Sequence, residues 1–217
     1  MMPFWPQRGT GEPLRVLCLG AHSDDIEIGC GGTILTWARA TPLDVRWIVL
    51  SADDEREREA RSAAASFLSG AKGRTVEVKR FRNGYFPTEG AAIKDYVESL
   101  KAGPAPDVIF THTGDDRHQD HRVVHELTWN TFRNDTILEY EIPKFDGDLG
   151  RPNVYVPLAE ATLQEKIRIA MTAFASQRDK HWFTEDLFRA LARLRGMECC
   201  APHAEAFHGR KVVLSAG

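Results

Sequence analysis

Short apolar runs alternate with longer segments of helical spacing along the first two thirds of the chain. The short runs are bounded by glycine, proline or polar residues, which is typical of buried strands. The segments between them carry apolar residues three and four positions apart, which is typical of amphipathic helices. The predicted strands are 14–21, 44–52, 75–81 and 107–112, and the predicted helices are 31–40, 53–70, 88–103 and 121–133.

Strand–helix alternation with short connections favours parallel strands that are joined by helical crossovers. We therefore expect an α/β fold with a Rossmann-like, mostly parallel sheet flanked by helices on both faces. Residues 1–12 are expected to be a flexible N-terminal leader, and residues 13–217 a single domain. The remaining predicted elements are strands 136–142 and 153–158, helices 161–176 and 184–196, and a terminal strand within 210–217.

Composition narrows the class of protein without identifying it. The 217 residues are 42% hydrophobic and 27% charged, as in ordinary globular domains, and the formal net charge is −3. This balance gives no general attraction to nucleic acid or to an anionic membrane, so neither partner is expected. The chain has no apolar stretch long enough for a membrane span and no recognisable signal peptide, and we expect a cytoplasmic protein with reduced cysteines. The sequence is compatible with a homo-oligomer.

Two polar clusters follow predicted strands directly. His22, Ser23, Asp24 and Asp25 come after strand 14–21, and a cluster from His112 to His121 comes after strand 107–112. Ligands of open parallel sheets bind outside the carboxyl ends of the strands. Either motif alone would also fit a solvated loop or the start of a surface helix. The occurrence of both motifs at the carboxyl ends of predicted parallel strands favours a functional site.

The residue types in these clusters suit a catalytic divalent metal. Adjacent carboxylates repel each other unless a cation offsets their charge. With His22 and Asp25 turned toward one ion, Asp24 would face a water on the metal, and zinc commonly takes three N/O ligands plus water. His118 or His121 would be the third ligand and the other would face substrate.

Polar neighbours in the second cluster can support those histidines. Asp115 or Asp116 could cap the helical turn that carries them. Asp120 could hydrogen-bond one of the histidines and fix its tautomer.

The segment AHSDDIEIGCGGT together with HQDHR resembles the PIG-L/LmbE-like family of zinc-dependent N-deacetylases. Ser23, Ile26 and Gln119 depart from the usual family pattern, but every expected ligand is in place. The resemblance implies that His22, Asp25 and His121 bind Zn²⁺, although Fe²⁺ or Co²⁺ also suit such ligands.

The same resemblance implies the catalytic roles. Asp24 would be the general base that takes a proton from the metal-bound water. His118 would stabilise the oxyanion or protonate the leaving amine, and Asp120 would orient a histidine. Arg56, near the start of the helix after the second strand, would contact the substrate, an N-acetylglucosamine-type sugar or glycoside. A solvated charged helix face is the competing interpretation of Arg56.

Three alternative functions compete with the deacetylase hypothesis. An amidase that removes a larger acyl group from an aminosugar conjugate would have the same motifs. A dinucleotide-binding oxidoreductase would need a glycine-rich turn where HSDD stands. The glycines Gly29, Gly31 and Gly32 lack phosphate-loop spacing and are better explained by tight helix packing. A non-catalytic metal-binding module would not need Asp24 or His118.

Overall fold

The computed structural model describes residues 11–213 of the chain, so most of the predicted leader lies outside the described residues. Over this range a seven-stranded sheet has the order β3-β2-β1-β4-β5-β7-β6. The first five strands pair in parallel, whereas β7 is antiparallel to both β5 and β6. The strands are β1 (Leu14–His22), β2 (Leu43–Ser51), β3 (Gly73–Val78), β4 (Val108–His112), β5 (Ile137–Tyr140), β6 (Val154–Leu158) and β7 (His203–His208).

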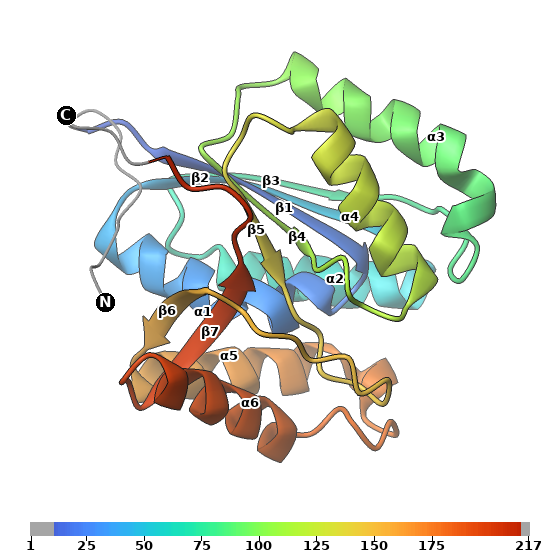
Figure 1. Cartoon of the computed structure of the whole chain (residues 1–217). Helices are drawn as coiled ribbons and strands as arrows, with labels where there is room; N and C mark the ends of the chain where they lie inside the picture. The colour runs from blue at the N-terminus through green and yellow to red at the C-terminus, as the bar shows by residue number, and fades with distance from the viewer. Residues whose placement is uncertain (1–10, 214–217) are drawn as a thin grey trace.

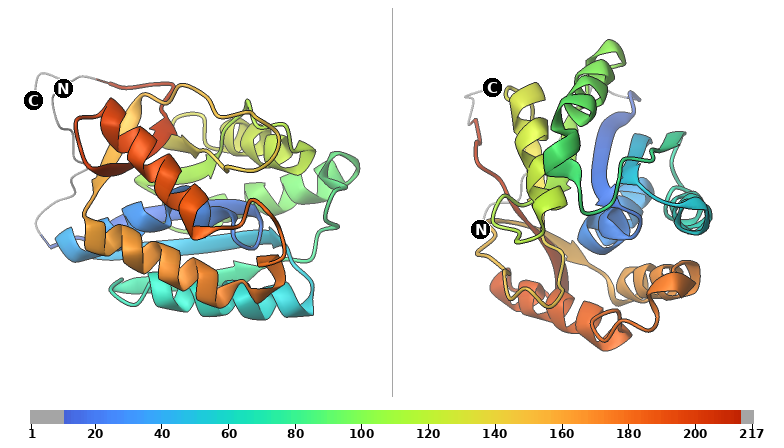
Figure 2. Two further views of the ribbon diagram at one scale, coloured as in Figure 1. Left: turned by 90° about the horizontal axis from the view of Figure 1, so that it is seen from below. Right: turned by 90° about the vertical axis from the view of Figure 1, so that its right-hand side faces the viewer.

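Helices cover both faces of this sheet, as predicted (Figures 1 and 2). The α-helices are α1 (Asp25–Ala40), α2 (Asp54–Phe67), α3 (Phe86–Ser99), α4 (Gln119–Thr131), α5 (Glu160–Ala173) and α6 (Glu185–Glu198). One buried cluster joins α1, α2, α5 and α6 to the sheet, and a second joins α3 and α4 to its other face. Alternate residues of β1 enter the two clusters, Val16 and Cys18 the first, Leu17 and Leu19 the second. The fold prediction is therefore confirmed.

Helix α1 begins earlier than predicted, at Asp25 rather than residue 31, and includes the glycines of GCGG. Glycine weakens a helix interior, but here each one allows a close contact. A Cβ on Gly29 would lie 2.3 Å from the ring of Tyr140, and one on Gly31 would lie 2.6 Å from Phe67. Tight packing of the helix, rather than phosphate binding, explains these residues.

The C-terminal strand prediction was wrong. Residues 210–213 form no strand and the rest of the predicted segment lies outside the described residues. Within residues 11–213 the last strand is β7, which lies between β5 and β6. Its Glu205 side chain accepts hydrogen bonds from Gly32 and Thr33 in α1. Val212 and Val213 are 68% and 90% exposed, so these two apolar residues after β7 do not pack against the sheet.

Within the described range, no helix combines the length and the apolar character that a bilayer crossing requires.

Candidate metal and active site

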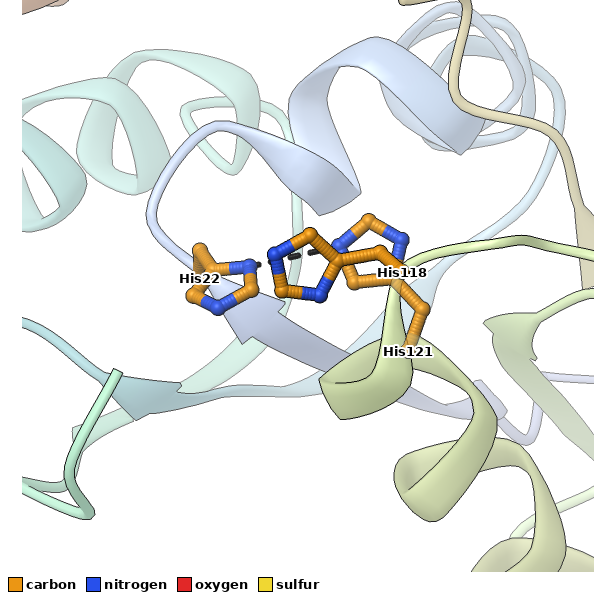
Figure 3. Close-up of side chains that lie close together, drawn as sticks. All are labelled: His22, His118 and His121. Carbon is orange, nitrogen blue, oxygen red and sulfur yellow. Dashed lines mark hydrogen bonds between the residues drawn. The ribbon is translucent and has the colours of Figure 1, made fainter. Parts of the chain in front are cut away.

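Strand order brings the two predicted polar clusters together. The sheet grows from β1 in both directions, toward β2 and toward β4, so the switch in strand order lies between β1 and β4. Ligands of open α/β sheets bind at such a point, outside the carboxyl ends of the strands. His22 ends β1 and His112 ends β4, and the turns after them lead into α1 and α4. His22, His118 and His121 consequently point toward one another (Figure 3).

The turn between β1 and α1 is tightly constrained. The backbone N–H of His22 donates to Oδ2 of Asp25 at 2.6 Å. Asp24 adopts a left-handed conformation with φ 100° and ψ −24°, which is uncommon for a residue other than glycine. Such strained residues concentrate at functional sites. Asp25 opens the helix, where the positive end of the helix dipole favours a carboxylate.

The three predicted metal ligands have donor atoms at suitable separations. Nδ1 of His22 lies 3.2 Å from Nε2 of His121 and 3.5 Å from Oδ2 of Asp25. Nε2 of His121 lies 3.5 Å from Oδ1 of Asp25. Zinc bonds of about 2.0–2.1 Å in a tetrahedral arrangement place neighbouring donors about 3.3 Å apart. All three side chains are buried, so the residues present fit a divalent metal.

The other nitrogen of each ring is already bonded to a carboxylate. Nε2 of His22 lies 3.1 Å from Oδ2 of Asp120, and Nδ1 of His121 lies 2.7 Å from Oδ2 of Asp116. Each carboxylate accepts an N–H, which leaves a lone pair on the nitrogen that faces the other ring. Two lone pairs at this distance need a cation between them, either a proton or a metal.

The pKa values of the two rings agree with that arrangement. Burial lowers the pKa of His22, but hydrogen bonds to Asp120 and Asp25 outweigh burial and raise it to about 9. Burial and the charge of His112 lower the pKa of His121 to about 3. These opposite shifts favour a cationic His22 beside a neutral His121 in the metal-free protein.

Two further histidines lie close enough to be considered as ligands. Donor atoms within 4.8 Å of one another form the sets His22, His118 and His121, and Asp25, His112 and His121. Nε2 of His112, however, accepts the backbone N–H of Ala21 at 3.0 Å, so its lone pair is already used. The sequence placed His112 at the start of the second polar cluster without giving it a role, and we assign it no metal bond.

His118 is arranged as a hydrogen-bond donor. It caps α4, where its Nδ1 accepts the backbone N–H of Asp120 at 3.2 Å. Burial, together with the charge of His22, lowers the pKa of His118, so the ring is neutral and its proton is on Nε2. The expected cap at Asp115 or Asp116 is therefore wrong. Asp116 instead accepts the backbone N–H of His118 at 2.8 Å.

Asp24 lies beside the ligands but belongs to neither donor set. Burial raises the pKa of this carboxyl to about 7, although the neighbouring guanidinium of Arg56 opposes the shift. Nη2 of Arg56 donates to Oδ1 of Asp24 at 3.0 Å and also to the backbone oxygen of Ser23. Such a carboxyl has the pKa that suits a general base near neutral pH. The structure brings Arg56 to the site through Asp24, and contact of Arg56 with substrate stays a prediction.

Asp120 and Asp116 have similar roles, because each carboxylate is bonded to one of the two proposed ligand histidines. Asp120, predicted to orient a histidine, is bonded to His22 and accepts backbone N–H groups of Gly84 at 2.6 Å and Phe86 at 3.1 Å. Asp116 holds His121 and is paired with Nζ of Lys144 at 2.9 Å. The role of Asp116 was missed because Lys144 lies beyond β5, and nothing in the local sequence indicates that contact.

Replacement of Asp116 tests this support of His121. We expect Asp116→Asn to weaken metal binding by about 10- to 100-fold, the usual cost of losing a carboxylate that orients a ligand histidine. Affinity can be measured by titration against a competing chelator. Asp115→Asn is the matched control, because Asp115 is the exposed neighbour. Equal affinities of the two variants would show that Asp116 does not orient His121.

Comparison with known proteins places the chain among related folds. Its structure resembles that of the conserved protein TT1542 from Thermus thermophilus, with 22% identity, a TM-score of 0.72 and coverage of 94% of this chain and 97% of that chain. It also resembles N,N'-diacetylchitobiose deacetylase from Pyrococcus horikoshii, with 21% identity, a TM-score of 0.68 and coverage of 95% and 87%. GalB, the 4-carboxy-2-hydroxymuconate hydratase from Pseudomonas putida KT2440, has 15% identity, a TM-score of 0.72 and coverage of 94% and 99%.

These likenesses establish the fold alone, and the presence of a hydratase among them shows that one fold supports different reactions. The family is shown by sequence. Residues 17–132, more than half of the chain, match the family described as PIG-L: GlcNAc-PI de-N-acetylase. This range includes both polar clusters that meet between β1 and β4. The chain therefore belongs to the PIG-L family.

Proposed function

We propose that this protein is a metal-dependent hydrolase that removes the N-acetyl group from an N-acetylglucosamine-type sugar or glycoside. The observation that carries the proposal is the 3.2 Å approach of Nδ1 of His22 to Nε2 of His121, with the outer nitrogen of each ring bonded to a carboxylate. This arrangement, beside Asp25, suits a divalent cation. Asp24 and His118 then supply the acid–base groups that hydrolysis needs.

His22, Asp25 and His121 would hold the metal. Nitrogen and carboxylate donors in this number suit Zn²⁺, and Fe²⁺ or Co²⁺ also accept them. When bound there, the metal supplies a Lewis acid for the amide carbonyl and lowers the pKa of the attacking water. Because each histidine is oriented by its own carboxylate, the geometry of the site is set before the metal binds.

The remaining side chains handle protons. Asp24 takes a proton from the attacking water as the general base, and its raised pKa fits that task near neutral pH. His118, whose proton is on Nε2, donates a hydrogen bond to the developing oxyanion and aids protonation of the departing nitrogen. Arg56 fixes the Asp24 carboxylate and has a second role in substrate contact.

A binding module without catalysis would need only the ligands. Asp24 is buried, backbone-strained and paired with Arg56, which is unfavourable for a residue with no function. The acetyl group and the sugar are supported by the description of the family and by the activity named for the Pyrococcus horikoshii relative. An amidase that removes a larger acyl group is the alternative outcome.

Release of acetate and amine from a substrate panel tests the proposal. We expect the zinc-loaded protein to hydrolyse N-acetylated sugars, nucleotide sugars or sugar conjugates, with activity lost on removal of the metal by a chelator and restored by added Zn²⁺, Fe²⁺ or Co²⁺. Conjugates with longer acyl groups form the comparison set. Preference for those conjugates would favour the amidase, and no hydrolysis of any substrate by metal-loaded protein would contradict the proposal.

A further inference from the structure

Two exposed aromatic rings lie near the candidate site, on loops that the catalytic roles above do not use. Phe145 follows β5 and is 70% exposed, the most exposed aromatic side chain among the large exposed apolar residues of the described chain. His181, on the segment between α5 and α6, is also exposed. The ring centroids are 6.2 Å apart and the planes differ by 27°, so the rings form a stacked pair. We call Phe145 and His181 the aromatic platform.

The loop that carries Phe145 reaches the candidate site through Lys144, the residue before the ring. Nζ of Lys144 lies 2.9 Å from Asp116, the carboxylate that orients His121. His181 stacks on the ring that follows Lys144, so the platform lies next to the lysine that supports the carboxylate behind one proposed metal ligand. Figures 1 and 2 show these two loops side by side, beyond the carboxyl ends of the central strands.

The loop that carries Phe145 is held at both ends. The backbone N–H of Arg117 donates to Asp148 at 2.8 Å, which ties the loop to the start of α4. The backbone N–H of Gly150 donates to Glu141 at 2.9 Å, and buried Arg195 donates to the oxygen of Gly150 at 3.2 Å. An exposed ring on an anchored loop is pre-organised for contact, and ordering it on binding costs little entropy.

We propose that the aromatic platform binds the face of the sugar ring whose acetamide is hydrolysed, and so determines substrate specificity. The inference rests on the proposed function, because it concerns the amine part of that substrate. A pyranose has an apolar C–H face and a polar edge, and the platform has the same character. Each ring has an exposed charged neighbour in the chain, Asp146 after Phe145 and Lys180 before His181, as a partner for the sugar hydroxyls.

The chemistry of the surroundings favours a sugar over a long acyl chain. An acyl chain is bound best in an enclosed apolar groove that removes it from water. Phe145 instead stands in solvent, next in the chain to exposed Asp146, and the ring nitrogens of His181 make its partner polar. An open, amphipathic surface of this kind suits a ring that keeps its hydroxyls hydrated.

The test compares a sugar with an acyclic acetamide. We expect Phe145→Ala to raise KM for methyl N-acetylglucosaminide by about 5- to 10-fold, with kcat unchanged within about twofold, as loss of one aromatic contact predicts. Hydrolysis of N-acetylethanolamine, which has no ring to stack, should not change. Phe145→Trp should restore the sugar KM. Binding of the product methyl glucosaminide, followed by NMR titration, should weaken by the same factor without any need for turnover.

Met197→Ala is the matched control, because Met197 is 61% exposed near the end of α6, away from the carboxyl ends of the central strands. An unchanged sugar KM in Phe145→Ala would overturn the proposal that the platform binds the sugar. An equal loss of activity with the sugar and the acyclic substrate would overturn it as well. A wild-type protein that releases no acetate from any sugar would instead contradict the proposed function. In that case the NMR comparison of wild type with Phe145→Ala still decides whether the platform binds the sugar.

Discussion

Asp24→Asn is expected to lower the rate of acetate release by about 100- to 10,000-fold while the protein keeps its metal. The amide cannot take a proton from water, yet it has nearly the size of the carboxylate and leaves the donor atoms of His22, Asp25 and His121 in place. Asparagine also tolerates the left-handed backbone at this position, where φ is 100°. The substitution should therefore lower kcat, and the metal content measured by atomic emission should be unchanged.

Asp54→Asn provides the control for this change. Asp54 is the first residue of the helix after the next parallel strand, but its carboxylate pairs with exposed Arg80 rather than with the site. This variant should keep full activity. If Asp24→Asn loses its metal together with its activity, Asp24 is a ligand rather than the base. Near-normal turnover with metal bound would remove Asp24 from the mechanism.

The convergence of the two polar clusters could be predicted because it depends on features that sequence displays well. Strand–helix alternation implies parallel strands, and parallel strands bring His22 and the His118–His121 turn to the same edge of the sheet. The family likeness then gave each residue a role. The structure confirms that these residues meet, and their roles in metal binding and catalysis are what we propose.

Contacts between distant segments could not be predicted in the same way. Lys144 reaches Asp116 across 28 positions of the chain, and Phe145 meets His181 across a larger separation. Neither pair has a motif or a period that links its members. The Asp116 carboxylate was consequently interpreted as a local helix cap, whereas its main partners are a ligand histidine and a lysine beyond β5.

The errors in secondary structure have a related cause. The segment His203–His208 is short, and only Phe207 within it has high strand propensity, so its sequence gives a weak strand signal. It becomes β7 because β5 and β6 pair with it from either side. Likewise the glycines at the start of α1 argue locally against a helix. Packing against Tyr140 and Phe67, visible only in the folded chain, selects the helix there.

His121→Ala is expected to weaken metal binding by at least about 100-fold, more than Asp116→Asn, because it removes a donor atom rather than its support. Acetate release should be lost and should not return with stoichiometric Zn²⁺. The variant should still fold, since Asp116 keeps its ion pair with Lys144 and is not left as an unpaired buried charge. Competition with a chromogenic chelator measures the affinity, and thermal unfolding of the metal-free protein measures stability.

His125→Ala separates loss of a ligand from damage to α4. His125 lies one helical turn beyond His121 and is also buried, but its ring contacts Glu139 and Arg210, which lie outside the candidate metal site. The His125→Ala variant should bind metal with the affinity of the wild type, even if its melting temperature falls. Wild-type metal affinity in His121→Ala would exclude this residue from the site. It would transfer the nitrogen ligands to His22 and His118, the remaining histidines of the donor set that contains His22, His118 and His121.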